Sequence, residues 1–302
     1  MSGEVEPASE LTPELRAFVE FVAKKGCELY RDLPWRRTYD PYAIWISEVM
    51  LQQTQVSRVD GRWQRWLERF PTVDALAAAA PSDVLEEWQG LGYNRRALSV
   101  HRAAQAISEA GGVFPQDPKE LVKLPGIGPA TAAGIRAFAF NLHGVYLETN
   151  VRTVFLHELY PQAEGVPDSE LVPLVELTCP ASVADAAGAD ETELTPRSWY
   201  YALLDYGAYL KKTIPNPSRR SKSHVKQSRF EGSHRQKRAE LLRVLLAHKD
   251  EGGAVFETLH QELCQIEVNA GRETLDEQVT LGLLEELAKE GFCQKNNEYW
   301  LP

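Results

Sequence analysis

Apolar residues recur at helical spacing along most of the chain, up to about residue 210. Start and stop signals of helices separate these runs. Thr12-Pro13 is a start signal, because threonine caps a helix and proline suits its first turn. Ser82 is expected to cap a later helix that ends at Gly90, and Asp117 a short one. No convincing run of alternating apolar and polar residues occurs in this region, so the sequence predicts an all-α main body.

The C-terminal segment, residues 235–302, has a different pattern. The spacing of its apolar residues predicts three helices, at 235–248, 256–264 and 274–290. Two short runs, 292–295 and 298–301, flank Asn296-Asn297 and predict a β-hairpin with a two-residue turn. Three helices closed by a hairpin are typical of a winged-helix-like module.

The composition is that of a globular protein, since 43% of the 302 residues are hydrophobic and 25% are charged. A chain of this length is expected to form two or three domains. It has no apolar stretch long enough to cross a membrane and no signal-peptide pattern near Met1, so we expect a cytoplasmic protein without membrane partners. The four cysteines are isolated, which favours reduced thiols over disulfides or a metal site.

The net charge of −10 argues against nucleic acid as a partner, but the charge is unevenly distributed. Between Lys211 and Arg238 there are ten Lys or Arg residues and one acid, whereas Ala239–Pro302 has five basic and thirteen acidic residues. Proline, serine and glycine in this basic strip predict a loop. Such a strip fits a connector that contacts phosphates, and a solvated linker is the alternative.

The most informative segment is Leu124-Pro-Gly-Ile-Gly-Pro-Ala-Thr-Ala132. Gly126 and Gly128 allow a tight turn whose backbone N–H groups are clear of side chains. A helix is expected to begin at about Pro129, so these groups and the helix dipole converge on one anion. Because a short helix precedes the turn, the segment is a candidate helix–hairpin–helix, which grips a DNA phosphate without reading sequence. A turn that only packs two helices is the alternative.

Several further motifs occur in a fixed order along the chain. They are Leu33-Pro-Trp-Arg36, Asp40-Pro-Tyr, Ser47-Glu-Val-Met-Leu-Gln-Gln-Thr-Gln-Val56, Phe70-Pro-Thr, Gly90-Leu-Gly-Tyr93 and the 124–132 hairpin. In this order and spacing they resemble the helix–hairpin–helix base-excision DNA glycosylases, and most closely the MutY-type adenine glycosylases. The resemblance covers roughly residues 12–212, and its motifs are multiple and collinear.

The resemblance implies a two-lobed, all-α glycosylase body over residues 1–212, with a DNA cleft between the lobes. One lobe would be a six-helix barrel, 33–145, and the other would combine 11–32 with 146–212. A basic connector, 213–234, would lead to the winged-helix-like domain, 235–302.

The resemblance assigns Glu48 as the general acid that protonates the departing base. Adenine leaves poorly as an anion, and a proton delivered to a ring nitrogen makes it a neutral leaving group. A solvent-facing helix glutamate is the alternative for Glu48. The family's second carboxylate is an aspartate that stabilises positive charge on the sugar, and Glu148 stands in its place within Leu147-Glu-Thr-Asn-Val-Arg-Thr-Val154. Glutamate adds one methylene, so Glu148 either does the aspartate's work with a shifted backbone or has lost it.

The resemblance also implies which residues contact DNA. Gln52 and Gln53 match residues that fill the duplex where the target nucleotide flips out, and polar groups at a helix end are the alternative. Ala130 stands where bifunctional members carry a Schiff-base lysine, so the enzyme is expected to be monofunctional, without AP-lyase activity. The remaining expected contacts in this region are Tyr93, Asn94, Gly126, Gly128 and Thr131.

Many relatives hold an iron–sulfur cluster with four cysteines after the segment that matches Leu203–Gly207. Residues 214–238 contain no cysteine, so no iron–sulfur cluster and no other cofactor is expected. The basic strip lies in the same place and is expected to contact phosphates instead, through Lys211, Lys212, Arg219, Arg220 and Lys222. The acidic C-terminal domain is expected to pack on the body or to bind a protein partner, and the family's domain that inspects 8-oxoguanine is not recognisable in it.

The leading hypothesis is a monofunctional DNA glycosylase of base excision repair, associated with the nucleoid. This hydrolase would release a flipped, mismatched or damaged base from double-stranded DNA, and adenine opposite 8-oxoguanine is the expected substrate. Asn94 stands where adenine-specific enzymes usually show a second aromatic residue, which favours the alternative of a thymine or uracil mismatch glycosylase. The replacement of the family's aspartate by Glu148 favours a third hypothesis, a catalytically inactive DNA-binding protein with the glycosylase fold.

Overall fold

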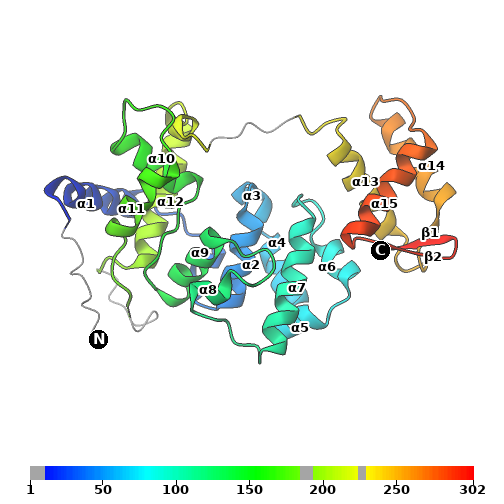
Figure 1. Ribbon diagram of the computed structural model, residues 1–302, viewed down its shortest axis with the longest axis horizontal. Coiled ribbons are helices and arrows are strands. Elements are labelled where there is room, and N and C mark those ends of the chain that lie inside the picture. The colour runs from blue at the N-terminus through cyan, green and yellow to red at the C-terminus, as the bar shows by residue number, and fades with distance from the viewer. Residues whose placement is uncertain (1–10, 184–192, 224–228) are drawn as a thin grey trace, which may run out of the picture. The chain divides into compact units, whose positions relative to one another are not determined.

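The computed structural model describes residues 11–183, 193–223 and 229–302, and these residues are mostly helical (Figure 1). Over the described residues, the one sheet is small and lies at the C-terminal end of the chain. Both findings confirm the predicted all-α body followed by a module of helices and a hairpin. No helix in these described ranges is long and apolar enough to cross a membrane.

The chain divides into two compact units. The first comprises the described residues of Met1–Glu48, Phe114–Lys123 and Ile127–Lys226, and the second those of Val49–Val113, Leu124–Gly126 and Gln227–Pro302. The lobes expected from the family resemblance divide the chain at other places and stay a prediction.

Long helices form the first unit. Its elements are α1 (Pro13–Glu28), the short 3-10 helix η1 (Pro34–Arg36), most of α2 (Pro41–Leu51), α8 (Pro118–Leu121), α9 (Pro129–Phe140), α10 (Thr149–Glu158), α11 (Asp168–Thr178), α12 (Pro196–Thr213) and the 3-10 helix η2 (Pro217–Arg220). α10 and α12 lie side by side, and α1 packs on α12 (Figure 1). The predicted caps at Thr12 and Asp117 are present, since Thr12 accepts the N–H of Leu15 and Asp117 that of Lys119.

Aromatic side chains fill the core of the first unit. The ring of Phe18 lies 5.0 Å from that of Phe155 and 6.1 Å from that of Trp199, both edge to face. The same core encloses charge, because the Arg36 guanidinium binds the Asp205 carboxylate through two hydrogen bonds of 2.7 and 2.8 Å. Both side chains are almost completely shielded from solvent, so each compensates the other's desolvation.

Shorter helices begin the second unit. They are the end of α2, then α3 (Val56–Val59), α4 (Arg62–Arg69), α5 (Val73–Ala78), α6 (Pro81–Glu87) and α7 (Arg95–Glu109). Their core includes Trp66 and Trp88, whose ring centroids are 5.5 Å apart. The expectation that Ser82 caps α6 is wrong. Pro81 occupies the first helical position after Ala80, and Ser82 is buried inside the first turn.

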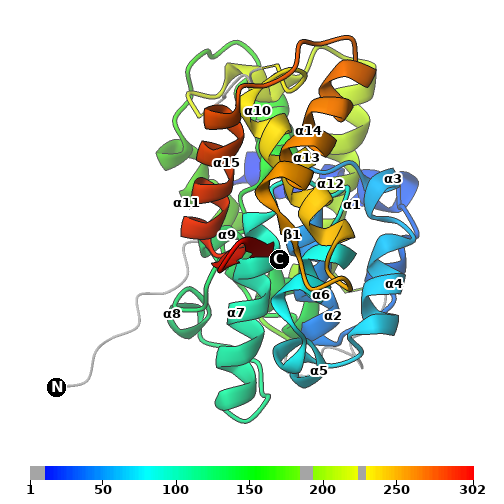
Figure 2. The same ribbon diagram turned by 90° about the vertical axis from the view of Figure 1, so that its right-hand side faces the viewer.

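The C-terminal module completes the second unit. It consists of α13 (His234–Ala247), β1 (Ala254–Val255), α14 (Phe256–Asn269), α15 (Glu277–Glu290), β2 (Gln294–Asn296) and β3 (Tyr299–Leu301). α13 packs against α14 and α15 (Figure 2), and β3 pairs antiparallel with both β1 and β2. The predicted hairpin is therefore confirmed, but its turn lies one residue later, at Asn297-Glu298, where Asn297 adopts φ +54°. β1 was not predicted, and α14 continues to Asn269 instead of ending at Cys264.

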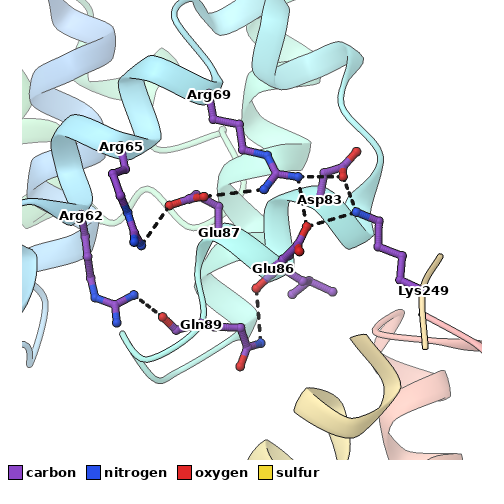
Figure 3. A network of polar contacts seen from close by, with 9 residues as sticks. Arg62, Arg65, Arg69, Asp83, Glu86, Glu87, Gln89 and Lys249 are labelled. Atoms are coloured by element: carbon purple, nitrogen blue, oxygen red, sulfur yellow. Dashed lines mark hydrogen bonds and ion pairs between the residues drawn. The ribbon is translucent and has the colours of Figure 1, made fainter. Parts of the chain in front are cut away.

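Ion pairs connect this module to other helices of the second unit. Lys249, just after α13, binds the carboxylates of Asp83 and Glu86, which Arg69 of α4 binds as well (Figure 3). Arg95 of α7 donates a 2.7 Å hydrogen bond to Glu290 of α15. These contacts agree with the expectation that the acidic module packs on the body, and a protein partner stays a prediction.

Candidate active site

Glu48 lies in the last turns of α2, a helix whose start is fixed by Asp40. The Asp40 carboxylate accepts the N–H groups of Tyr42 and Ala43 at 3.1 and 3.3 Å, as an N-cap does. The helix is buried along most of its length, and Glu48 is a half-buried carboxyl group among apolar neighbours. α2 therefore holds an ionisable group where water has little access.

Tyr146 fixes the orientation of the Glu48 side chain. Its hydroxyl donates a 2.9 Å hydrogen bond to Glu48 Oε2. Tyr146 is itself buried, and its backbone N–H donates to the hydroxyl of Tyr200 at 3.1 Å. The Tyr200 hydroxyl in turn donates to the Gly144 carbonyl. Tyr146 thus binds one oxygen of Glu48. Tyr146 is itself held by its hydrogen bond to Tyr200, which is held in turn by the Gly144 carbonyl.

Gly134, inside α9, provides the space that Glu48 occupies. A Cβ atom at this position would lie 2.4 Å from Glu48 Oε2 and 2.9 Å from the ring of Tyr146. Both distances are shorter than van der Waals contact, so any larger residue would displace the carboxyl group or the tyrosine. Glycine normally weakens a helix interior by about 1 kcal/mol relative to alanine. Its presence here is explained by the close approach of Glu48.

Burial raises the pKa of Glu48 to about 7. The nearby Glu148 carboxylate adds to this rise, whereas the hydrogen bond from Tyr146 and the charge of Arg36 oppose it. A carboxyl group with this pKa is substantially protonated near neutral pH, which a general acid requires.

Glu148 is held in a different way, as the N-cap of α10. Its Oε1 accepts the N–H of Asn150 at 2.6 Å and that of Val151 at 3.3 Å. Burial raises the pKa of Glu148, and these N–H groups together with the charge of Lys211 oppose the rise. Every partner that the structure gives this side chain therefore stabilises its ionised form.

Glu48 and Glu148 both belong to the first unit, and each is a half-buried residue within electrostatic range of the other. The structure therefore brings the two predicted catalytic residues together. Burial raises the pKa of both, but their partners differ, because Glu48 accepts a hydrogen bond from a tyrosine and Glu148 accepts the N–H groups at the start of a helix. Such a pairing is characteristic of acid–base sites.

The second unit contains the loop with Gln52 and Gln53. Tyr93 donates a 2.5 Å hydrogen bond from its hydroxyl to Gln53, and both residues have positive φ values, +52° and +53°. Sequence reasoning missed Arg96, whose guanidinium donates to the carbonyls of Val49 and Gln52 at 2.7 and 2.6 Å. Burial lowers the pKa of Arg96 to about 10. The signal that could have found it is its place two residues after the Gly92-Tyr93-Asn94 motif. Asn94 precedes α7 as its N-cap residue without a capping hydrogen bond from its side chain.

The expected hairpin joins α8 to α9. Gly126 has φ +77°, and a Cβ there would lie 2.6 Å from Ser99 Cβ, so a glycine is required on both counts. Gly128 precedes α9 with no side-chain cap, as expected for a turn that presents N–H groups. Ala130 is exposed in the first turn of α9, and Thr131 is buried beside it.

The basic strip is partly folded onto the first unit, and residues 224–228 of the expected connector lie outside the described residues. Lys211, Lys212, Arg219 and Lys222 are exposed. Arg220 instead donates to main-chain carbonyls at the end of α10 and beyond it, those of Leu156 at 2.8 Å, Tyr160 at 2.5 Å and Pro161 at 2.8 Å. Its guanidinium therefore attaches η2 to α10.

An iron–sulfur cluster does not fit the residues that follow α12. The described residues from Ile214 to Ser223 supply no thiolate, and the whole stretch 214–238 contains no cysteine. The four cysteines of the chain lie elsewhere, at Cys27, Cys179, Cys264 and Cys293.

Similarity to known proteins identifies the family of this chain. Residues 46–195 match the HhH-GPD superfamily base excision DNA repair protein family. The adenine DNA glycosylase of Mycolicibacterium smegmatis is 37% identical over 223 residues, which cover 71% of this chain and 75% of that protein. The protein of the same name from Mycobacterium tuberculosis is 36% identical over 234 residues, which cover 72% of this chain and 75% of that protein.

A solved structure of a thermostable thymine-DNA glycosylase has the same fold. It superimposes with a TM-score of 0.56 at 22% identity, covering 68% of this chain and 90% of that one. The chain therefore belongs to the HhH-GPD superfamily of base excision DNA repair proteins, and it is a DNA glycosylase.

Proposed function

We propose that this DNA glycosylase removes adenine opposite 8-oxoguanine in duplex DNA by hydrolysis, with Glu48 and Glu148 as its catalytic residues. The observation that carries the proposal is the pair of carboxyl groups with opposite surroundings, one desolvated and one capping a helix. The names of the two mycobacterial relatives support adenine as the base.

Glu48 acts as the general acid. With a pKa near 7 it carries a proton at neutral pH, and it delivers that proton to a ring nitrogen of the flipped base as the glycosidic bond breaks. Because Tyr146 engages Oε2, we assign the delivery of the proton to Oε1. As the pH rises above about 7, the fraction of protonated Glu48 falls and the rate falls with it.

Glu148 stabilises the positive charge that develops on the sugar. The N-terminus of α10 and Lys211 favour its ionised form, against the burial that raises its pKa. A fixed negative charge in a site with little water stabilises an oxocarbenium-like transition state strongly. Water then completes the hydrolysis, and Ala130 supplies no amine for a Schiff base at the hairpin, so strand cleavage is not part of the reaction.

Three groups of residues are assigned to duplex binding: the hairpin, the two glutamines and the exposed cations of the basic strip. The hairpin with Gly126 and Gly128 grips one phosphate, and Gln52 and Gln53 fill the space that the flipped nucleotide leaves. The exposed cations Lys212, Arg219 and Lys222 contact further phosphates without an iron–sulfur cluster. Arg220 is left out of this set because its guanidinium is bound to carbonyls.

A mismatch-specific thymine or uracil glycosylase is the second candidate function. Asn94 favours it, since this polar residue follows Tyr93 in the loop that would face the flipped base.

A panel of duplexes, each with one defined base pair, separates these functions. Single-turnover reactions followed by alkali would be run on A:8-oxoguanine, A:G, T:G, U:G and matched DNA, with Glu48→Gln as the control. The proposal expects the fastest product release from A:8-oxoguanine and none from the matched duplex. Product from T:G or U:G alone would establish the second candidate, and no product from any duplex would establish a binding protein.

Borohydride trapping in the same reactions tests the absence of lyase chemistry. We expect no covalent complex and no strand break before alkali is added. A trapped complex would show that another amine replaces the missing lysine.

A further inference from the structure

Lys211 belongs to the basic strip, yet its ammonium group is engaged within the first unit. It lies in the last turn of α12, and its Nζ donates a 3.1 Å hydrogen bond to Oδ1 of Asn150. The backbone N–H of Asn150 in turn donates to Glu148 Oε1 at 2.6 Å. Two hydrogen bonds therefore connect Lys211 to the carboxylate of Glu148 through one residue.

Gly207, one turn earlier on α12, brings the two helices together at this point. A Cβ at Gly207 would lie 2.3 Å from the carbonyl oxygen of Asn150 and 2.8 Å from its Cβ. Residues four apart lie on the same face of a helix, so Gly207 and Lys211 both face the first turn of α10. The close backbone approach sets the position from which Lys211 reaches Asn150.

We propose that Lys211 is a positioning residue of the glycosylase reaction, which orients Asn150 and places a fixed positive charge beside Glu148. The proposal rests on the catalytic role proposed above for Glu148. It gives Lys211 a task in the chemical step, in place of the phosphate contact that its membership of the basic strip implied.

The groups around Glu148 explain why a cation is useful there. α10 contributes the N–H groups of Asn150 and Val151, and α12 contributes Lys211. α2 contributes Glu48, with Tyr146 bound to it. Burial and any ionised fraction of Glu48 oppose the ionisation of Glu148, and Lys211 counters both. Without Lys211, a larger share of Glu148 would be protonated in the range where Glu48 must keep its proton.

Single-turnover rates across pH, measured with protein in excess on an A:8-oxoguanine duplex, test the proposal. Lys211→Met removes the charge and the hydrogen bond, so Glu148 ionises only at higher pH. We expect the acidic limb of the rate profile to move up by about half to one pH unit, with a rate lowered about 3- to 10-fold on that limb. Lys211→Arg keeps the charge and the donor, so it should restore the limb to its original place. A purely structural role would lower the rate equally at every pH and leave the limb unmoved.

Lys212→Met is the matched control, since it removes the same charge from the neighbouring exposed position. It is expected to weaken duplex affinity and its salt dependence, and to leave the acidic limb in place. An equal shift of the limb in Lys212→Met and Lys211→Met would overturn the proposal, because a general loss of charge would then explain both.

Glu148→Ala, measured in parallel, separates this inference from the proposed function. If Glu148→Ala abolishes base release while Lys211→Met leaves the limb unmoved, the role of Glu148 stands and that of Lys211 is refuted. If Glu148→Ala releases base at the full rate, the proposed role of Glu148 fails and the positioning role fails with it. Loss in Glu148→Ala together with a shifted limb in Lys211→Met supports both.

Discussion

Charged side chains form clusters in two regions of this protein, and the two clusters differ in their access to water. In the first unit, Glu48 and Glu148 are half-buried, and burial is the largest cause of the raised pKa of each. In the second unit, Asp83 and Glu86 lie near the surface between Arg69 and Lys249, and these cations lower the pKa of both acids (Figure 3). The pKa values of the carboxyl groups are thus raised in the first cluster and lowered in the second.

The difference indicates which cluster can perform chemistry. A carboxyl group with an ordinary or lowered pKa is ionised at neutral pH and can only pair with cations or accept hydrogen bonds. A desolvated group near pKa 7 can exchange its proton during a reaction. Burial alone does not make a site, because Arg36 and Asp205 are more completely buried and satisfy each other. The candidate active site is the place where a desolvated acid, hydrogen-bonded by Tyr146, lies within electrostatic range of a second carboxyl group.

The largest expected effect follows from Glu48→Gln. Glutamine keeps the shape and can still accept the Tyr146 hydrogen bond, but it has no proton to deliver to the base. We expect the single-turnover rate of base release to fall by about 10³-fold, with duplex affinity within a few-fold of the original. A rate within tenfold of the original protein would show that the two clusters do not differ in the way proposed.

Glu148 should show the next largest effect, and its size should depend on charge more than on length. Glu148→Ala removes the anion and the cap of α10, so we expect about 10²- to 10³-fold slower base release and about 1 kcal/mol lower stability. Glu148→Asp keeps the charge, and aspartate is an equally good N-cap, so its rate should stay within about tenfold or rise. Rates of both variants on one duplex, with chemical denaturation curves, provide the comparison. Equal losses in Asp and Ala would mean that the exact reach of the glutamate matters more than its charge.

Gly134→Ala tests the space around Glu48 without changing any charge. The new methyl group would overlap Glu48 Oε2, so we expect about 10- to 100-fold slower base release with a folded protein. Gly282→Ala is the matched control, because it also lies inside a helix and its Cβ would meet no atom within 4 Å. It should raise stability by up to about 1 kcal/mol and leave the rate unchanged. An unchanged rate in Gly134→Ala would show that Glu48 does not need this position.

Much of the fold could be predicted from local signals, and the failures have local causes. Thr12, Asp117 and Pro129 mark helix starts because capping and proline geometry act within a few residues. Ser82 misled the prediction because proline at the preceding position fixes the start two residues earlier, with Ala80 as the N-cap. β1 is two residues long and depends on pairing with β3, about forty-five residues later, which no local pattern reveals.

The candidate site was predictable in part. Glu48 and Glu148 followed from motifs that resemble a family, but their surroundings did not. Tyr146 and Gly134 are far from Glu48 in sequence and meet it only because α9 and the segment before α10 fold against α2. That Lys211 contacts a phosphate stays a prediction, and charge counting could not reveal its hydrogen bond to Asn150, which lies about sixty residues away in the sequence.

The stability of the protein should also depend on Glu48, in a direction set by its raised pKa. In the unfolded chain a glutamate has a pKa of about 4.5, and in the folded protein that of Glu48 is about 7. Its contribution to stability is therefore fully present below about pH 4.5 and is lost as the pH rises through 7. Glu48→Gln, which cannot ionise, should be more stable than the original protein at about pH 8, by about 1 to 3 kcal/mol, and of similar stability at about pH 5. Urea denaturation at both pH values measures this, with the exposed Glu68→Gln as control.

The smallest effect is expected in the exposed cluster. Lys249 is one of two cations shared by Asp83 and Glu86, and Arg69 remains when it is removed. Pairs at this exposure typically contribute little, so Lys249→Met should lower stability by about 0.5 kcal/mol or less. The loss should shrink further at about 1 M salt, where charges are screened within about 3 Å. Urea denaturation at low and high salt measures this loss. Lys289→Met, at an exposed position of α15, is the control. A loss above 2 kcal/mol that persists in high salt would mean that Lys249 behaves as a buried residue, and the contrast between the two clusters would not hold.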